Sequence, residues 1–391
     1  MTPTIAVLGG SSPFTVAMVE ALADPAQGVP SARLVLQGRS VEALELLESY
    51  SQRRLGSGWS VSSTTDLDTA IEGATIVVHQ IRYGGLNGRD DDERLAASFG
   101  CPPDETLGPA GLQAALRAGP FLSHLGERIK HLAPKAWVLN LTNPLSVATA
   151  CLAEHVGEKR IGLCELPLHT AMLACNQLGI SLEDTSWAYT GLNHRGFVYH
   201  LPNSDVDLVE RLARLSDDIT IGNIPVKVIR ELGAVPTKYF RLMLGQCVLA
   251  KGRAAELESL RSQILKELAE NLQAVPKSLS KRDMPWYEMS VVPVIASILN
   301  NDGRKHVANV LSDGIVRELP VSIGNKGWTE TKQLPANPAV NHWVQRFERH
   351  ERAVLAATLE QSEHRILEAV ELDPLTPRGK ERTIAEQLLR N

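Results

Sequence analysis

The chain has 391 residues, and this length suggests two domains with a large apolar core. Hydrophobic residues make up 43% and charged residues 22% of the chain, a composition that excludes a disordered protein. A net charge of −5 provides no basic surface for nucleic acid or an anionic membrane, so we expect neither partner. The apolar start lacks the features of a signal peptide, and five irregularly spaced cysteines indicate reduced thiols, so we expect a cytoplasmic protein.

The first half of the chain alternates short apolar runs with helical patterns, as is typical of a parallel sheet covered by helices on both faces. After about residue 175, a short β stretch from Trp187 to Leu201 is followed by mostly helical sequence, with amphipathic runs near Lys238 to Gln273 and Asn341 to Leu372. We therefore predict an α/β fold with one domain over residues 1–175 and a mostly helical α+β domain over residues 176–391. The strands predicted in the first domain are Thr4 to Leu8, Arg33 to Gln37, Thr75 to Gln80, Trp137 to Leu141 and Arg160 to Cys164.

The stretch "IAVLGGSSPFTVAMVEAL" leads from the first predicted strand into a helix, with Ser12 as the expected N-cap and Pro13 as the first helical residue. Glycines in such a turn let backbone N–H groups approach a pyrophosphate at the positive end of the helix. The full G-x-G-x-x-G pattern is absent, so a tight turn without a ligand is the alternative. The candidate cofactor-binding residues here are Gly9, Gly10, Ser11 and Ser12.

The end of the second predicted strand, "LVLQGRS", is where an acidic residue binds the ribose hydroxyls of NAD in dinucleotide-binding folds. Gly38 and Arg39 stand there instead. A guanidinium suits a 2′-phosphate, which favours NADP; an exposed arginine at the start of a helix is the alternative. The cofactor is therefore expected to be NAD or NADP.

Three polar motifs, "NLTNP", "GLCELP" and "GLNHRG", follow predicted strands, and parallel-sheet enzymes bind their ligands at the carboxyl ends of strands. Cys164 as a thiolate and His194 as a neutral imidazole could bind a divalent transition metal, and Asn143 could supply an oxygen. Such a metal would act as a Lewis acid on a carbonyl or enolate. The alternative is that the histidine is structural and the cysteine is a small core residue, as we expect for Cys151, Cys175 and Cys247.

Together, seven motifs in this order resemble the family 4 glycoside hydrolases, which depend on NAD and a metal. The resemblance runs from residue 5 to about residue 320. It implies a Rossmann-type domain related to lactate and malate dehydrogenases, a mostly helical second domain, a homodimer or homotetramer, and Mn²⁺ as the expected metal. The motifs are "GGSSPFT", "RYGGLNGRDDDER", "DETLGPAGL", "NLTNP", "GLCELP", "GLNH" and "HVANVLSDGIVRELP".

The resemblance also implies a redox-neutral cleavage of a glycoside or sugar phosphate. The nicotinamide takes hydride from C3 of the sugar, which acidifies the C2 proton, and a tyrosinate then removes that proton while the metal stabilises the enediolate. The C1 substituent leaves by elimination, water adds, and the hydride returns.

Roles carried over from the family fall on six residues. They are Cys164 and His194 as metal ligands, Asn143 at the C2 and C3 oxygens, Tyr287 as the base, Glu165 as the proton donor to the leaving oxygen, and Arg89 at the 6-phosphate.

The sequence departs from the family at the tyrosine motif, where Asp283 and Met284 replace two glycines after Arg282. Arg304 and Lys305 are the nearest candidates for a second phosphate-holding cation. Two other functions remain open. One is an NAD(P)-dependent sugar or hydroxy-acid dehydrogenase or epimerase without glycoside cleavage, and the other is a non-catalytic nucleotide- or sugar-binding protein.

Overall fold

A computed structural model describes residues 2–183, 185, 187–200, 202–203, 206–246 and 252–390. Within these residues, nine strands form one sheet in the order β16-β15-β14-β6-β5-β4-β1-β2-β3. The six strands from β6 to β3 are parallel to one another, whereas β14, β15 and β16 are antiparallel. The strands are β1 (Thr4–Leu8), β2 (Arg33–Gln37), β3 (Ser60–Thr64), β4 (Ile76–His79), β5 (Trp137–Asn140), β6 (Arg160–Gly162), β14 (Lys305–Ser312), β15 (Ile315–Gly324) and β16 (Gly327–Glu330).

Helices cover both faces of this sheet, because alternate residues of each buried strand point to opposite faces. In β1, Ile5 and Val7 pack against α1, α2, α10 and α11, whereas Ala6 and Leu8 face α3, α4, α5, α6 and the C-terminal helices. The predicted α/β fold is therefore confirmed. The helices are α1 (Thr15–Ala23), α2 (Val41–Leu55), α3 (Leu67–Ile71), α4 (Gly85–Ser98), α5 (Gly108–Leu132), α6 (Leu145–Val156), α10 (Arg253–Glu270), α11 (Val292–Asn300), α12 (Pro338–Glu360), α13 (Glu363–Leu372) and α14 (Glu381–Arg390).

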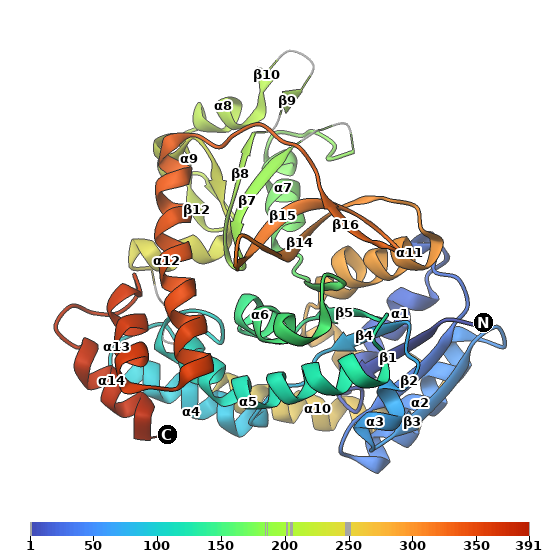
Figure 1. Ribbon diagram of the computed structural model, residues 1–391. Coiled ribbons are helices and arrows are strands. Elements are labelled where there is room, and N and C mark those ends of the chain that lie inside the picture. The colour runs from blue at the N-terminus through green and yellow to red at the C-terminus, as the bar shows by residue number, and fades with distance from the viewer. Residues whose placement is uncertain are drawn as a thin grey trace.

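A smaller core lies around a three-stranded sheet in the order β13-β8-β7. Figure 1 shows this region above the parallel strands and beside β14 and β15, with the long helix α12 running from it down to α5. Its elements are α7 (Leu166–Gln177), β7 (Ala188–Leu192), β8 (Arg195–His200), β9 (Pro202–Asn203), β10 (Val206–Asp207), α8 (Leu208–Ala213), β11 (Thr220–Ile221), β12 (Ile224–Pro225), α9 (Val226–Leu232) and β13 (Val235–Pro236).

The predicted strands all exist, and β1 and β2 have the predicted bounds. The sequence pattern does not predict β3, an edge strand whose residues "SVSST" are mostly polar. It also does not predict β14 to β16, although Asp313 and Gly314 have the positive φ angles of 52° and 71° that a tight hairpin turn requires. Residues 305–330, expected within a mostly helical part, therefore add three strands to the main sheet.

The first helix starts later than expected. Helix α1 begins at Thr15, not at Pro13, and its N-cap is Phe14 without a side-chain hydrogen bond. The N–H of Thr15 donates to the carbonyl of Ser12 over 2.9 Å, three residues back, so a tight turn precedes the helix. Leu201, at the end of the predicted β stretch, and Cys247 lie outside the described residues. In the described part of the chain, every helix is too short or too polar to cross a membrane.

Candidate active site

A cavity of about 510 Å³ lies at the carboxyl ends of the parallel strands. It is lined by Gly9 after β1, Gly38 after β2, Gln80 after β4, Asn143 after β5 and Cys164 after β6. Because these ends meet at one edge of the sheet, residues far apart in the sequence converge, as the motifs predict. Of the predicted site residues, all except Gly10 line this cavity, namely Gly9, Ser11, Ser12, Arg39, Arg89, Asn143, Cys164, Glu165, His194 and Tyr287.

The N–H groups of the glycine turn after β1 form hydrogen bonds to the end of β2. The N–H groups of Gly9 and Gly10 both donate to the carbonyl of Gln37, over 3.0 and 2.6 Å. A Cβ at Gly10 would lie 2.9 Å from the Val7 carbonyl oxygen, so this glycine is required by packing. These two N–H groups are therefore not directed at a pyrophosphate as predicted.

Tyr287 lines the cavity, and its hydroxyl is held by a hydrogen bond. It donates to Oε1 of Gln80 over 2.7 Å. The Gln80 amide nitrogen donates in turn to Oγ1 of Thr15 over 3.0 Å, which fixes the orientation of the amide. Tyr287 opens a single π-helical turn before α11, a distortion frequent at functional sites. Burial raises the pKa of Tyr287 to about 12, so its phenol is neutral at ordinary pH.

Arg282 lies beside this tyrosine. Its guanidinium carbon is 4.3 Å from the ring centre of Phe14 and 5.3 Å from that of Trp286. Burial lowers the pKa of Arg282 to about 10, and its positive charge partly offsets the rise in the pKa of Tyr287. Although two glycines of the family motif are missing, both Arg282 and Tyr287 reach the cavity.

Cys164 and His194 line the same cavity, as a shared metal would require. His194 has a φ of 64°, and its ring stacks on Tyr239 with a centroid distance of 4.0 Å and an interplanar angle of 3°. Burial lowers the pKa of His194 to about 3, so the imidazole is neutral. Its Nδ1 is buried and has no hydrogen-bond partner among the described residues.

These features fit a divalent cation. Burial and the negative charges of Glu165 and Glu318 raise the pKa of the Cys164 thiol, and a bound cation would oppose that rise. Oε2 of Glu165 lies 3.7 Å from the Cys164 sulfur. Within the described ranges, no three His, Cys, Asp or Glu side chains gather as a metal site. Two ligands would therefore leave coordination positions for substrate oxygens.

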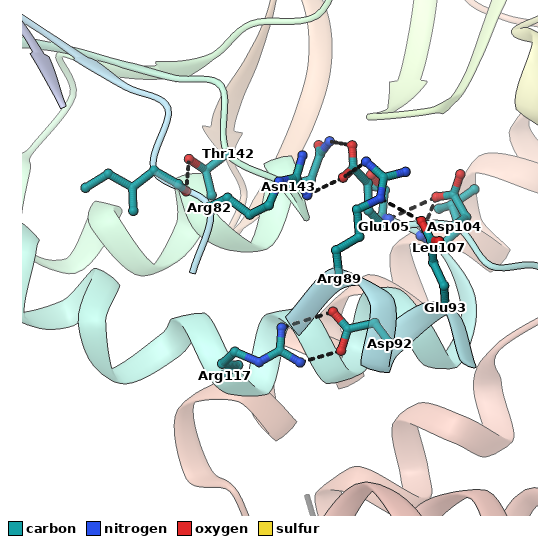
Figure 2. Close-up of polar contacts among 12 residues, drawn as sticks. Arg82, Arg89, Asp92, Glu93, Asp104, Glu105, Leu107, Arg117, Thr142 and Asn143 are labelled. Atoms are coloured by element: carbon teal, nitrogen blue, oxygen red, sulfur yellow. Dashed lines mark hydrogen bonds and ion pairs between the residues drawn. The ribbon is translucent and has the colours of Figure 1, made fainter. Parts of the chain in front are cut away.

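Glu105, to which the sequence assigns no role, accepts hydrogen bonds from several polar side chains that line the cavity. Figure 2 shows Arg82, Arg89 and Asn143 directed at its carboxylate. The Arg89 guanidinium donates over 2.9 Å and the Asn143 amide over 3.1 Å. Burial alone would raise the pKa of Glu105, but the two arginine charges outweigh it and hold the pKa below its ordinary value. The signal in the sequence was the motif "DETLGPAGL", which contains this glutamate.

Arg89, the predicted phosphate ligand, is therefore already paired. Besides Glu105, it donates to Oε1 of Glu93 over 2.6 Å. Arg304 pairs with Asp302 over 2.8 Å, and neither Arg304 nor Lys305 lines the cavity.

Comparison with known proteins identifies the family. The sequence matches the profile "Family 4 glycosyl hydrolase" over residues 4–180 and the profile "Family 4 glycosyl hydrolase C-terminal domain" over residues 189–376. The chain belongs to glycosyl hydrolase family 4. It is 25% identical to the 6-phospho-beta-glucosidase BglT of Thermotoga maritima, over 95% of this chain and 94% of that protein. It is 29% identical to the alpha-galacturonidase of Bacillus subtilis, over 46% of this chain and 42% of that protein.

Solved structures agree on the fold. The 6-phospho-beta glucosidase from Thermotoga maritima with manganese, NAD⁺ and glucose-6-phosphate has a TM-score of 0.88 at 24% identity, covering 99% of this chain and 98% of that one. A 6-phospho-alpha-glucosidase from gut microorganisms with NAD and Mn²⁺ has a TM-score of 0.86 at 20% identity, covering 100% and 98%. Lactate dehydrogenase from Eimeria maxima has a TM-score of 0.54 at 16% identity, covering 92% and 95%, consistent with the predicted Rossmann-type domain.

Proposed function

We propose that this family 4 hydrolase cleaves an O-glycosidic bond by a redox-neutral elimination and addition, with a nicotinamide dinucleotide and Mn²⁺. One observation carries the proposal: a single cavity collects Cys164, His194 and Tyr287 with the turn after β1. These are a metal-ligand pair, a phenol and a dinucleotide-type turn. Each could be structural by itself, but a glycosidase of this kind needs all three beside one sugar ring.

The chain's own residues divide the proton transfers between them. Tyr287, whose neutral hydroxyl donates to Gln80, first loses that proton to solvent and then removes the C2 proton as the phenolate, a form that the charge of Arg282 favours. Glu165 donates a proton to the leaving oxygen at C1. Asn143 orients the C2 and C3 hydroxyls. When bound, the dinucleotide supplies a hydride acceptor and donor at C3, and the metal supplies positive charge beside the C2 and C3 oxygens.

Cys164 and His194 would hold the metal. Support comes from the unpartnered ring nitrogen of His194 and from the neutral state that burial imposes on its imidazole. Stacking on Tyr239 holds the ring in one orientation. NAD together with Mn²⁺ in a structural relative makes these the first cofactors to test.

The proposed substrate is a glycoside, with or without a 6-phosphate. Named relatives include 6-phospho-beta-glucosidases, 6-phospho-alpha-glucosidases and alpha-galacturonidases. Similarity to these relatives therefore determines neither the anomer of the substrate nor its substituent at C6. A 6-phosphate near Arg89 would meet a guanidinium that already has two carboxylate partners. Unphosphorylated sugars therefore belong in any substrate panel.

The test uses chromogenic α- and β-glycosides, with and without a 6-phosphate and with deuterium at C2, together with Mn²⁺ and NAD⁺ or NADP⁺. We expect release of the chromophore, slower turnover of the deuterated sugars and exchange of the C2 position with solvent. Absence of both release and exchange across the panel would count against the proposal. Net formation of reduced dinucleotide would instead indicate a dehydrogenase. Light scattering tests the homodimer or homotetramer, which stays a prediction.

A further inference from the structure

The carboxyl end of β2 lacks the group that dinucleotide-binding folds use to recognise the unmodified ribose. That group is an acid, which accepts hydrogen bonds from the 2′- and 3′-hydroxyls of NAD, whereas an arginine in this region accommodates the 2′-phosphate of NADP. Here the last strand residue is Gln37, whose side-chain amide donates to the carbonyl of Thr65 over 3.3 Å. Gly38, Arg39 and Ser40 follow, so this turn contains no carboxylate.

Packing excludes a side chain at the first of these positions. A Cβ at Gly38 would lie 2.2 Å from Oγ of Ser11 and 2.8 Å from its backbone nitrogen. Gly38 is also held by a hydrogen bond from its N–H to the carbonyl of Thr64, over 3.3 Å. An acidic residue at position 38 would have to displace the turn after β1. The packing of this turn therefore excludes a carboxylate at position 38.

Arg39 offers an available positive charge at the same end of the cavity. Its side chain is exposed, lines the cavity and makes no ion pair within the described residues. Four other cavity arginines bond to carboxylates. They are Arg82 and Arg89 on Glu105, Arg117 on Asp92, and Arg261 on Glu258.

The helix that follows adds to this positive potential. Ser40 caps α2, its hydroxyl accepting from the N–H of Ala43 over 3.3 Å, and α2 then runs for 15 residues. The positive end of this helix dipole lies next to Arg39, and both favour a phosphate dianion there, against the single opposing charge of Glu42 in the first turn.

We infer that this hydrolase selects the 2′-phosphorylated dinucleotide, NADP(H), with Arg39 contacting the 2′-phosphate. The inference rests on the dinucleotide site of the proposed function and adds the identity of the cofactor. It sets this chain apart from the structural relatives that contain NAD.

The experiment measures binding by isothermal titration calorimetry on the full chain, without sugar, for NADP⁺, NAD⁺, 2′,5′-ADP and 5′-AMP. We expect NADP⁺ to bind more tightly than NAD⁺, and 2′,5′-ADP more tightly than 5′-AMP, each by about tenfold or more. Arg39→Ser should weaken NADP⁺ binding by roughly tenfold to a hundredfold and leave NAD⁺ nearly unchanged. Arg39→Asp should reverse the preference.

Arg53→Ser is the matched control, because Arg53 is an exposed arginine in the last turn of the same helix, roughly 20 Å away along its axis. It should leave all four affinities unchanged. Equal or tighter binding of NAD⁺ by the unaltered chain, or an equal loss of both dinucleotides in Arg39→Ser, overturns the inference while the proposed function stands. If neither dinucleotide binds, both are overturned.

Discussion

Two arginine–carboxylate clusters in this protein have similar chemistry and different surroundings. Arg89 and Glu105 lie on the cavity wall, with side chains 13% and 22% exposed. Arg195 of β8 and Glu351 of α12 pair in the interior, where they are 5% and 10% exposed, and Nδ1 of His350 lies 3.0 Å from the same arginine. The first cluster borders the 510 Å³ cavity, which also contains the unpartnered ring nitrogen of His194.

The difference shows why an ion pair alone does not mark an active site. In the interior cluster the charges join two elements of the smaller core, and neither Arg195 nor Glu351 lines the cavity. In the cavity cluster the same type of pair orients Asn143 toward a space that a ligand can enter. We therefore expect changes in the interior cluster to affect folding and changes at the cavity to affect catalysis.

The largest expected effect at the cavity is that of Tyr287→Phe. Loss of the phenol should lower kcat by about 10²- to 10⁴-fold, because the general base is removed, and should abolish solvent exchange at C2. Tyr50→Phe is the control, since Tyr50 is also buried and donates to Glu20 over 2.6 Å but does not line the cavity. Equal turnover by Tyr287→Phe and the unaltered chain would leave no catalytic role for this phenol.

The largest expected effect in the interior cluster is that of Glu351→Gln. Arg195 would become a buried charge without its counterion, which should reduce the free energy of unfolding by about 3–5 kcal/mol. Urea denaturation measures this loss, and kcat of the folded variant should not change. Glu348→Gln on the same helix is the comparison, because its partner Arg317 is more exposed, and it should cost less. A reversed order of the two losses would contradict our assignment of the interior cluster to stability.

In contrast to Glu351→Gln, Glu105→Gln should lower activity more than stability. Removing the charge releases Arg82 and Arg89 and disturbs Asn143, so kcat/KM should fall by roughly a hundredfold through misplacement of the substrate. Its effect on stability should be smaller than that of Glu351→Gln, because water in the cavity can solvate the released arginines. Steady-state kinetics and urea denaturation on the same preparations test both statements. A loss of stability with unchanged kinetics would remove the contrast between the clusters.

The smallest expected effect is the dependence of activity on pH. The pKa of Tyr287 is raised to about 12, so below that pH the reactive phenolate is the minor form and its fraction rises as protons are removed. The value of kcat/KM should therefore increase with pH between neutral and mildly alkaline conditions, by at most about tenfold per unit. A flat or falling profile in this range would indicate that C2 deprotonation by this tyrosine does not limit the rate.

The sequence alone determined the parallel sheet and the place of the site. Buried strands such as Thr4–Leu8 are apolar runs flanked by turn residues, and this local pattern is readable without neighbours. The carboxyl ends of such strands meet at one edge, so polar motifs that follow them converge on one cavity. For this reason Asn143 and Cys164 could be predicted to lie together, whereas His194 stands in the turn between the antiparallel strands β7 and β8 of the smaller sheet and reaches the cavity only through the packing of the two sheets.

Only the tertiary structure decided which polar groups of the site are already hydrogen-bonded within the protein. The N–H groups of Gly9 and Gly10 bond to Gln37, and the hydroxyl of Tyr287 bonds to Gln80, 207 residues away in the sequence. Strand β14 joins β6 across a similarly long separation. Such pairings depend on the packing of distant segments, whereas periodicity and turn residues report only on local structure, so no local pattern in the sequence contains them.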